Sequence, residues 1–164
     1  MSLETLPTAV DDLLKAAGHP TASLQIALDT IASEFEARTA TLHFADNRER
    51  KLHMVAQRGI PDHIAAITRE IPFGKGMAGI CAERLTPVEV CNVQTDASGQ
   101  VRAGAKETGV AGAIVIPVVE GGRLVGTLGI GKSEEHEYSD VERKTLEACA
   151  VKLAHPLGQL RFDK

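Results

Sequence analysis

Two stretches of the sequence alternate apolar with polar or small residues on either side of a short turn. In the first, TATLHFA and KLHMVAQR flank DNRER, and in the second, AGAIVIPVV and RLVGTLGIG flank EGG. This alternation predicts β-strands, and the short polar or glycine-rich connections predict hairpins. We therefore expect hairpins over Ala40–Arg58 and Gly112–Gly131, lying side by side in an antiparallel sheet.

Helical patterns lie before and after these hairpins. Apolar residues three and four positions apart predict one helix before the break GHP at residues 18–20 and a second helix over residues 24–35. A last helix begins at SDVE, where Ser139 and Glu142 have capping-box spacing, and Pro156 should end or kink it. This order of elements predicts an α+β fold with a central antiparallel β-sheet and helices on one face.

Composition excludes several classes of protein. The 164 residues suffice for one compact domain, and the net charge of −4 argues against a nucleic-acid partner, which needs a basic face. No apolar run approaches the ~20 residues of a membrane span, and the acidic N-terminus does not fit a signal peptide. We expect no membrane partner, a cytoplasmic location and three reduced cysteines.

The stretch IPFGKGMAGICAERLTPVEVCNV has two possible interpretations. Gly74, Gly76 and Gly79 fit the G-x-G-x-x-G nucleotide fingerprint, and Cys81 and Cys91 are spaced like a possible redox pair. A nucleotide loop follows a buried strand within a βαβ unit, whereas TREIPF is short, charged and interrupted by proline. We expect the first two glycines to allow a positive-φ turn and the third to allow close helix packing.

The order of motifs resembles that of a GAF domain. The glycine turn and PVEVCNV are followed by GVAGAIVIPVVEGGRLVGTLGIG and YSDVERKTLEACAVKLA, a likeness that runs from about Thr21 to Leu153. The resemblance implies a sheet with helices on one face and a ligand pocket on the other, roofed by about Gly74–Thr108. It also divides the chain into an N-terminal helical extension, residues 1–18, and a GAF domain, residues 19–164.

Some stand-alone GAF proteins are free methionine-(R)-sulfoxide reductases. The position of one of their cysteines corresponds here to Ala78, and no cysteine lies between Asp96 and Ile116. The reductase cysteines therefore do not carry over, although Cys81 and Cys91 could form a pair of their own or act as small apolar fillers. We expect no catalytic residues, no cofactor and no metal.

The site residues expected from position and resemblance include two histidines. His43 and His53 face each other if the first hairpin is symmetric about Arg48, whereas a one-residue register change places Met54 opposite His43. Two histidines make an incomplete metal site, so we expect each to lie in the pocket wall or at the surface with its hydrogen bonds satisfied. The full ligand-binding set that we expect is His43, His53, Met77, Cys81, Arg102, Lys106 and Thr108.

These observations favour a non-enzymatic sensor or regulatory GAF protein that binds an unknown small molecule in signal transduction. The alternatives are a thiol-dependent reductase of a small oxidised metabolite, such as free methionine sulfoxide, and a ligand-free dimerisation module. The apolar stripe of the first helix, Leu3, Leu6, Val10 and Leu13, predicts a homodimer through the terminal helices. We expect the output to pass through that dimer or through a signalling partner.

Overall fold

A computed structural model describes residues 1–16, 20–98, 100, 101 and 103–160. Its centre is a six-stranded sheet of order β3-β2-β1-β6-β5-β4, in which every neighbouring pair is antiparallel. The two predicted hairpins are β1 (Thr39–Asp46) with β2 (Lys51–Arg58), and β5 (Ala113–Glu120) with β6 (Arg123–Gly131). β1 pairs with β6, so the hairpins are neighbours and this prediction is confirmed.

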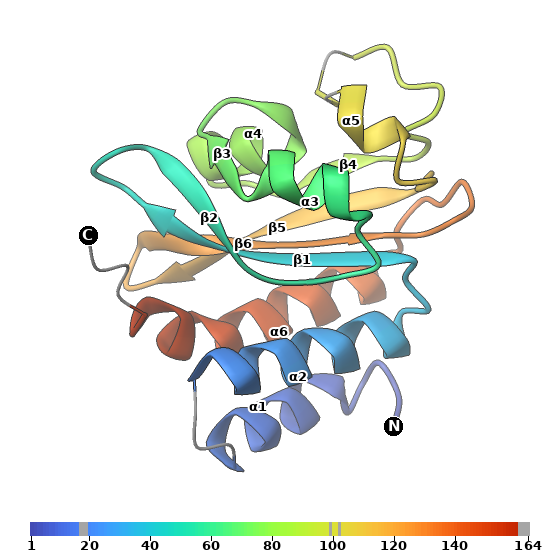
Figure 1. Ribbon diagram of the computed structural model, residues 1–164. Helices are drawn as coiled ribbons and strands as arrows, with labels where there is room; N and C mark the ends of the chain where they lie inside the picture. The colour runs from blue at the N-terminus through green and yellow to red at the C-terminus, as the bar shows by residue number, and fades with distance from the viewer. Residues whose placement is uncertain (17–19, 99, 102, 161–164) are drawn as a thin grey trace.

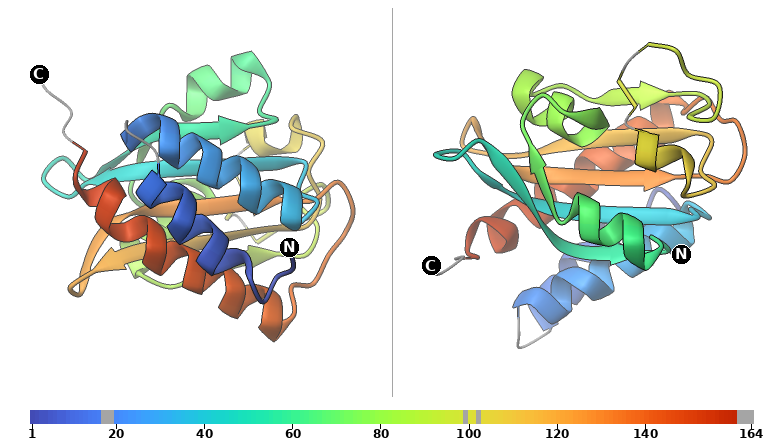
Figure 2. Two further views of the ribbon diagram at one scale, coloured as in Figure 1. Left: turned by 90° about the horizontal axis from the view of Figure 1, so that it is seen from below. Right: turned by 45° about the horizontal axis from the view of Figure 1, so that its top comes forward.

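Two long helices cover one face of the sheet, and a third packs on their outer side (Figure 1; Figure 2, left). They are α1 (Leu6–Ala16), α2 (Pro20–Glu34) and α6 (Asp140–Gly158). Their apolar faces and those of the central strands share one buried cluster, to which α2 contributes Leu28, α6 Leu153, β1 Leu42 and β6 Leu128. This face, which we call the helix face, holds the main hydrophobic core.

Short elements surround the opposite face (Figure 1). They are α3 (Asp62–Thr68), β3 (Glu70–Pro72), α4 (Gly76–Arg84), β4 (Val88–Val90) and α5 (Ala103–Lys106). The two short strands extend the sheet at its edges, β3 beside β2 and β4 beside β5. The fold is therefore the expected α+β arrangement, and we call this second side of the sheet the cavity face.

The glycine turn behaves as the sequence predicts. Gly74 and Gly76 have φ of +87° and +65°, the left-handed region that glycine adopts without steric cost. A Cβ at Gly79 would lie 2.5 Å from the carbonyl oxygen of Pro72, so this glycine lets α4 pack closely. These residues serve backbone geometry, and the strand before them, β3, is a short strand at the sheet edge.

The apolar stripe of α1 is mostly covered by its own chain. Leu6 and Val10 are fully buried in the main core, and Leu3 packs against that core from its edge. Leu13 is half-buried, so α2 and α6 bury the first part of the stripe and leave Leu13 partly exposed. The predicted domain boundary at residues 18 and 19, with most of the GHP break, lies outside the described residues.

The last helix has the predicted start and a longer end. The Ser139 hydroxyl accepts a hydrogen bond from the Glu142 N–H, and the Glu142 carboxylate accepts one from the Ser139 N–H. This reciprocal pair is the capping box. The helix continues to Gly158, two residues beyond Pro156, so the proline does not end it.

Candidate functional site

A cavity of about 490 Å³ lies on the cavity face. The short helices that border it stand over this face of the sheet in Figure 2, right. The cavity floor consists of alternate residues of β1, β6 and β5: Thr39, Thr41 and His43, then Gly129 and Gly131, then Ala113 and Val115. Its walls come from α3, the start of α4, α5 and the segment around β4. The pocket predicted opposite the long helices is therefore present in the structure.

Apolar side chains dominate the walls of the cavity. Those from α3 and the loop before it are Ile60, Ile64 and Ile67, and those from the other side are Met77, Val93, Val101, Ala105 and Val110. Among the described residues, the charged members of the lining are Lys75 and Glu107, and both are exposed at the surface. The buried part of the described lining is therefore electrically neutral.

His43 is the most deeply buried polar group of the floor. Its side chain is 2% exposed, and its Nε2 lies 2.9 Å from the carbonyl oxygen of Thr68. Burial lowers the pKa of His43 to about 4. The nearby His53 also lowers this pKa, whereas the hydrogen bond to Thr68 raises it. His43 is therefore neutral at pH 7. Its Nδ1 is buried without a hydrogen-bond partner among the described residues.

The two histidines do not face each other. The turn of this hairpin pairs Asp46 with Lys51, and in the register that follows His43 pairs with Met54 and His53 with Phe44. A bulge comes only after these pairs, between His43 and Leu42. His53 does not line the cavity, and its Nδ1 lies 3.9 Å from a carboxylate oxygen of Glu70. The alternative register considered from the sequence is the one that the chain adopts.

His53 also lies beside two carboxylates at the turn of the first hairpin. Its possible ligand atom and those of Asp46 and Glu49 lie within 4.8 Å of one another. Asp46 Oδ1 accepts the backbone N–H groups of Arg48 and Glu49, so this carboxylate already caps the turn. Turn geometry accounts for the placement of the group.

The other expected site residues fall into different places. Met77 and Thr108 line the cavity, but the Thr108 hydroxyl is already used, donating to Ala105 O and accepting from Val110 N–H. The exposed side chain of Lys106 is not part of the lining. Arg102 lies outside the described residues.

Cys81 is part of the packing beneath α4. It is fully buried beside Val88 and Val115, and its thiol lies 3.8 Å from the carbonyl oxygen of Val115. Burial raises the pKa of the Cys81 thiol to about 12, so the reactive thiolate is disfavoured. Cys81 does not line the cavity, Cys91 is exposed, and all three cysteines are free thiols.

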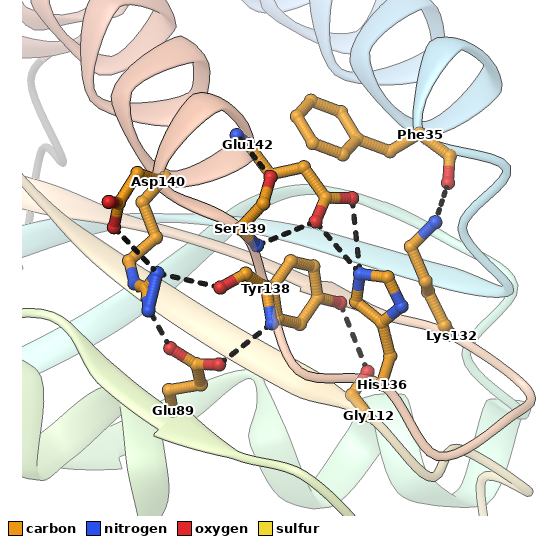
Figure 3. Close-up of polar contacts among 10 residues, drawn as sticks. Phe35, Glu89, Gly112, Lys132, His136, Tyr138, Ser139, Asp140 and Glu142 are labelled. Atoms are coloured by element: carbon orange, nitrogen blue, oxygen red, sulfur yellow. Dashed lines mark hydrogen bonds and ion pairs between the residues drawn. The ribbon is translucent and has the colours of Figure 1, made fainter.

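A polar network joins the segment beside the cavity to α6 (Figure 3). The Tyr138 hydroxyl donates to Gly112 O at 3.1 Å, and the Tyr138 N–H donates to the Glu89 carboxylate at 2.9 Å. The same carboxylate pairs with Arg143 Nε at 3.3 Å. β4, the start of β5 and the first turn of α6 are thereby held together by one tyrosine and one ion pair.

His136 adds a second connection to this network. Its backbone N–H donates to Cys91 O at 3.1 Å, and its ring Nε2 lies 2.9 Å from the carboxylate of Glu142, a member of the capping box. Val110, two residues before Gly112, and Ala113, the residue after it, line the cavity. Movement of this part of the wall would therefore change the position of the first turn of α6.

Comparison with known proteins places the fold in a family. A family model described as a GAF domain matches residues 19–155. The chain belongs to the GAF domain family, whose members are small-molecule-binding sensor domains, and the resemblance in the sequence is confirmed. A search of curated proteins finds no match.

Solved structures agree on the fold. The GAF domain of a phosphoenolpyruvate-protein phosphotransferase from Coxiella burnetii has a TM-score of 0.82 at 21% identity, covering 96% of this chain and 93% of its own. The corresponding domain from Acinetobacter has a TM-score of 0.77 at 13% identity, with 93% and 90% covered. A free methionine-R-sulfoxide reductase from Neisseria meningitidis, solved with its substrate, has a TM-score of 0.78 at 17% identity. The match covers 94% of this chain and 87% of the reductase.

Proposed function

We propose that this protein is a non-catalytic sensor or regulatory GAF domain that binds a small molecule in the cavity. The observation that carries the proposal is the cavity of about 490 Å³, whose floor of threonine, glycine and alanine leaves room above the sheet. Ligand sites of this kind are concave, mostly apolar and supplied with a few polar groups.

The described helices include none with the length and apolar character of a membrane span. We further propose that the domain acts in the cytoplasm.

The polar network of Tyr138 and Glu89 supports an output through α6. A ligand that shifts the wall between Val110 and Ala113 changes the distance from Gly112 to Tyr138, and hence the position of the first turn of α6. In this proposal the terminal helices carry the signal to a second copy or a partner protein. Val141 and Val151 of α6 are 63% and 68% exposed and offer apolar contact area for that association.

The state of the cysteines supports a non-enzymatic role. A reductase needs a thiolate at its substrate, whereas Cys81 is buried away from the cavity with a pKa raised to about 12. The alternative of a thiol-dependent reductase would have to use Cys91, which is exposed and does not line the cavity. The observations therefore favour binding over catalysis.

Native mass spectrometry tests this proposal. The purified protein is incubated with the small-molecule fraction of a cell extract, and bound mass and subunit count are read from one spectrum. We expect an adduct on the wild type, its loss in Ala113→Phe, which fills the floor, and its retention in Val119→Phe. The control lies on the same strand but is exposed and outside the cavity. A wild type that takes up nothing would contradict the sensor proposal, and a strictly monomeric mass would contradict the dimer.

A further inference from the structure

The polar side chains of the cavity floor form a single row along β1. Thr39, Thr41 and His43 alternate along the strand and so follow one another on one face, about 7 Å apart at each step. Among the described residues, the hydroxyls of Thr39 and Thr41 have no hydrogen-bond partner. They lie beside Gly131 and Gly129, where a Cβ atom would come within 2.8 Å and 3.0 Å of them. Glycine at both positions keeps space over this row.

The hydrogen bond of His43 fixes which of its ring nitrogens carries the proton. A carbonyl oxygen only accepts, so Nε2, 2.9 Å from Thr68 O, is the N–H donor. In a neutral imidazole the other nitrogen is then a bare acceptor. Nδ1 therefore offers a lone pair, and buried groups of this kind are rarely left without a donor in folded proteins.

In the part of the chain that the structure describes, charge is confined to the mouth of the cavity. Lys75 and Glu107, the charged lining residues, are both exposed, and Glu107 lies 3.4 Å from the exposed His63. The floor beneath them is built from threonines, glycines, apolar residues and a histidine. An ion moved into this part of the cavity would lose its hydration without meeting an opposite charge, which is strongly unfavourable.

We propose that the cavity selects an uncharged small molecule with an apolar body and an O–H or N–H donor, and that His43 determines this selection by accepting the donor at Nδ1. The inference rests on the proposed function, since it requires that the cavity bind a ligand. Nδ1 is covered in the structure, so the contact requires a small shift of the ring or of the neighbouring wall. That shift is repaid by the hydrogen bond gained.

The test uses matched probes that differ in their head group alone. The first series is cyclohexanol, methoxycyclohexane, cyclohexanecarboxylate and cyclohexylamine, and the second is p-cresol, 4-methylanisole, 4-methylbenzoate and 4-methylbenzylamine. Binding is followed by the NMR shifts of the Ile64 and Val115 methyl groups, which line the cavity. The ¹⁵N resonance of His43 Nδ1 reports directly on the proposed bond.

We expect the alcohol and the phenol to bind about threefold to tenfold more tightly than their methyl ethers, the range that one hydrogen bond supplies. The charged members should bind more weakly still, and Nδ1 should shift with the donors but not with the ethers. His43→Phe should abolish the difference between donor and ether, and His43→Gln, which keeps an acceptor, should retain it. If His43→Phe does not fold, the Nδ1 resonance of the wild type decides.

The possible failures are distinguishable. Methyl shifts without a donor preference, or a preference for the carboxylates or amines, would overturn the role of His43 and leave the sensor proposal standing. A donor preference that persists in a folded His43→Phe variant would overturn it as well. If no member of either series moves the Ile64 or Val115 methyl groups, the cavity is not a ligand site and the proposed function itself fails.

Discussion

The helix face and the cavity face of the sheet differ, although the same strands build both. On β1, Ala40 and Leu42 point into the main core and are 1% and 0% exposed. The residues that alternate with them on the chain, Thr39, Thr41 and His43, border the cavity. Because side chains alternate between the two faces of a strand, a single strand carries a packed pattern and an open pattern at once.

β6 repeats the contrast in side-chain size. Leu128 and Ile130 fill the helix face, whereas Gly129 and Gly131 lie on the floor of the cavity. Large residues on one face interdigitate with the long helices, and glycines on the other face leave the volume above them open. The cavity is thus specified by residue size along the central strands, and substitutions on the two faces should have different effects.

Leu42→Ala on the helix face should have the largest effect on stability. The substitution removes a fully buried side chain from a core formed by three helices and the sheet, and such changes cost about 2–5 kcal/mol in the free energy of unfolding. Its neighbour on the cavity face, Thr41→Val, keeps the side-chain volume and should change stability by less than about 1 kcal/mol. Urea unfolding of both variants measures the contrast, and equal losses would show that the two faces are equally packed.

The hairpins and the capped helix could be predicted because their signals are local. Alternation over eight residues and a polar turn determine a hairpin within one stretch of chain. The polar alternation of Thr39, Thr41 and His43 was equally visible in TATLHFA, and it could have identified the two threonines as floor residues. They were missed because threonine is also common on solvated strand faces.

Other features depend on contacts that are distant in the sequence. Met77 and Cys81 are one turn apart on α4, so the helical period predicted a shared place in the roof. Met77 borders the cavity, but Cys81 packs further along the helix against Val88 and Val115. The pairing of Asp46 with Lys51 at the turn likewise places Met54, and not His53, opposite His43. Neither the position of α4 over the sheet nor this register can be read from spacing.

Acid should weaken the fold through His43. Its pKa is about 4 in the folded protein and the ordinary value is 6.5, so below pH 6.5 the unfolded chain takes up a proton that the folded chain does not. Stability attributable to His43 is therefore present above pH 6.5 and is lost as the pH falls toward 4, with about 2 kcal/mol gone near pH 5.

The measurement is urea unfolding of the wild type and His43→Gln at several pH values between neutral and mildly acidic. Subtracting the two curves removes the contribution of other groups, including the neighbouring His53. The difference should grow as the pH falls, in favour of the variant. A difference that stays constant with pH would mean that His43 titrates normally and that the floor is wetter than its burial indicates.

Gly76→Ala should have a smaller effect at the roof of the cavity. Gly76 begins α4 with φ of +65°, and an alanine there strains the backbone by about 1 kcal/mol. Gly76→Asn should cost less, because asparagine adopts this region more readily. Thermal unfolding of both variants gives the comparison, and an alanine variant as stable as the wild type would remove the geometric role of this glycine.

Gly129→Ala should separate stability from binding most clearly. A Cβ at this position would lie 3.0 Å from Thr41 Oγ1 and 3.5 Å from Val115, and Thr41 can turn toward the open cavity to make room. The added methyl group restricts the unfolded chain and offsets this small strain, so stability should change by no more than about 0.5 kcal/mol. The floor nevertheless rises into the space beside the polar row, and the donor probes should bind at least severalfold more weakly.

Gly131→Ala is the matched control for packing, because its Cβ would meet Val110 at 2.6 Å and Thr39 at 2.8 Å, and it should destabilise the fold. If Gly129→Ala binds the probes as the wild type does, the ligand does not rest on the floor, and the contrast between the two faces is one of packing alone.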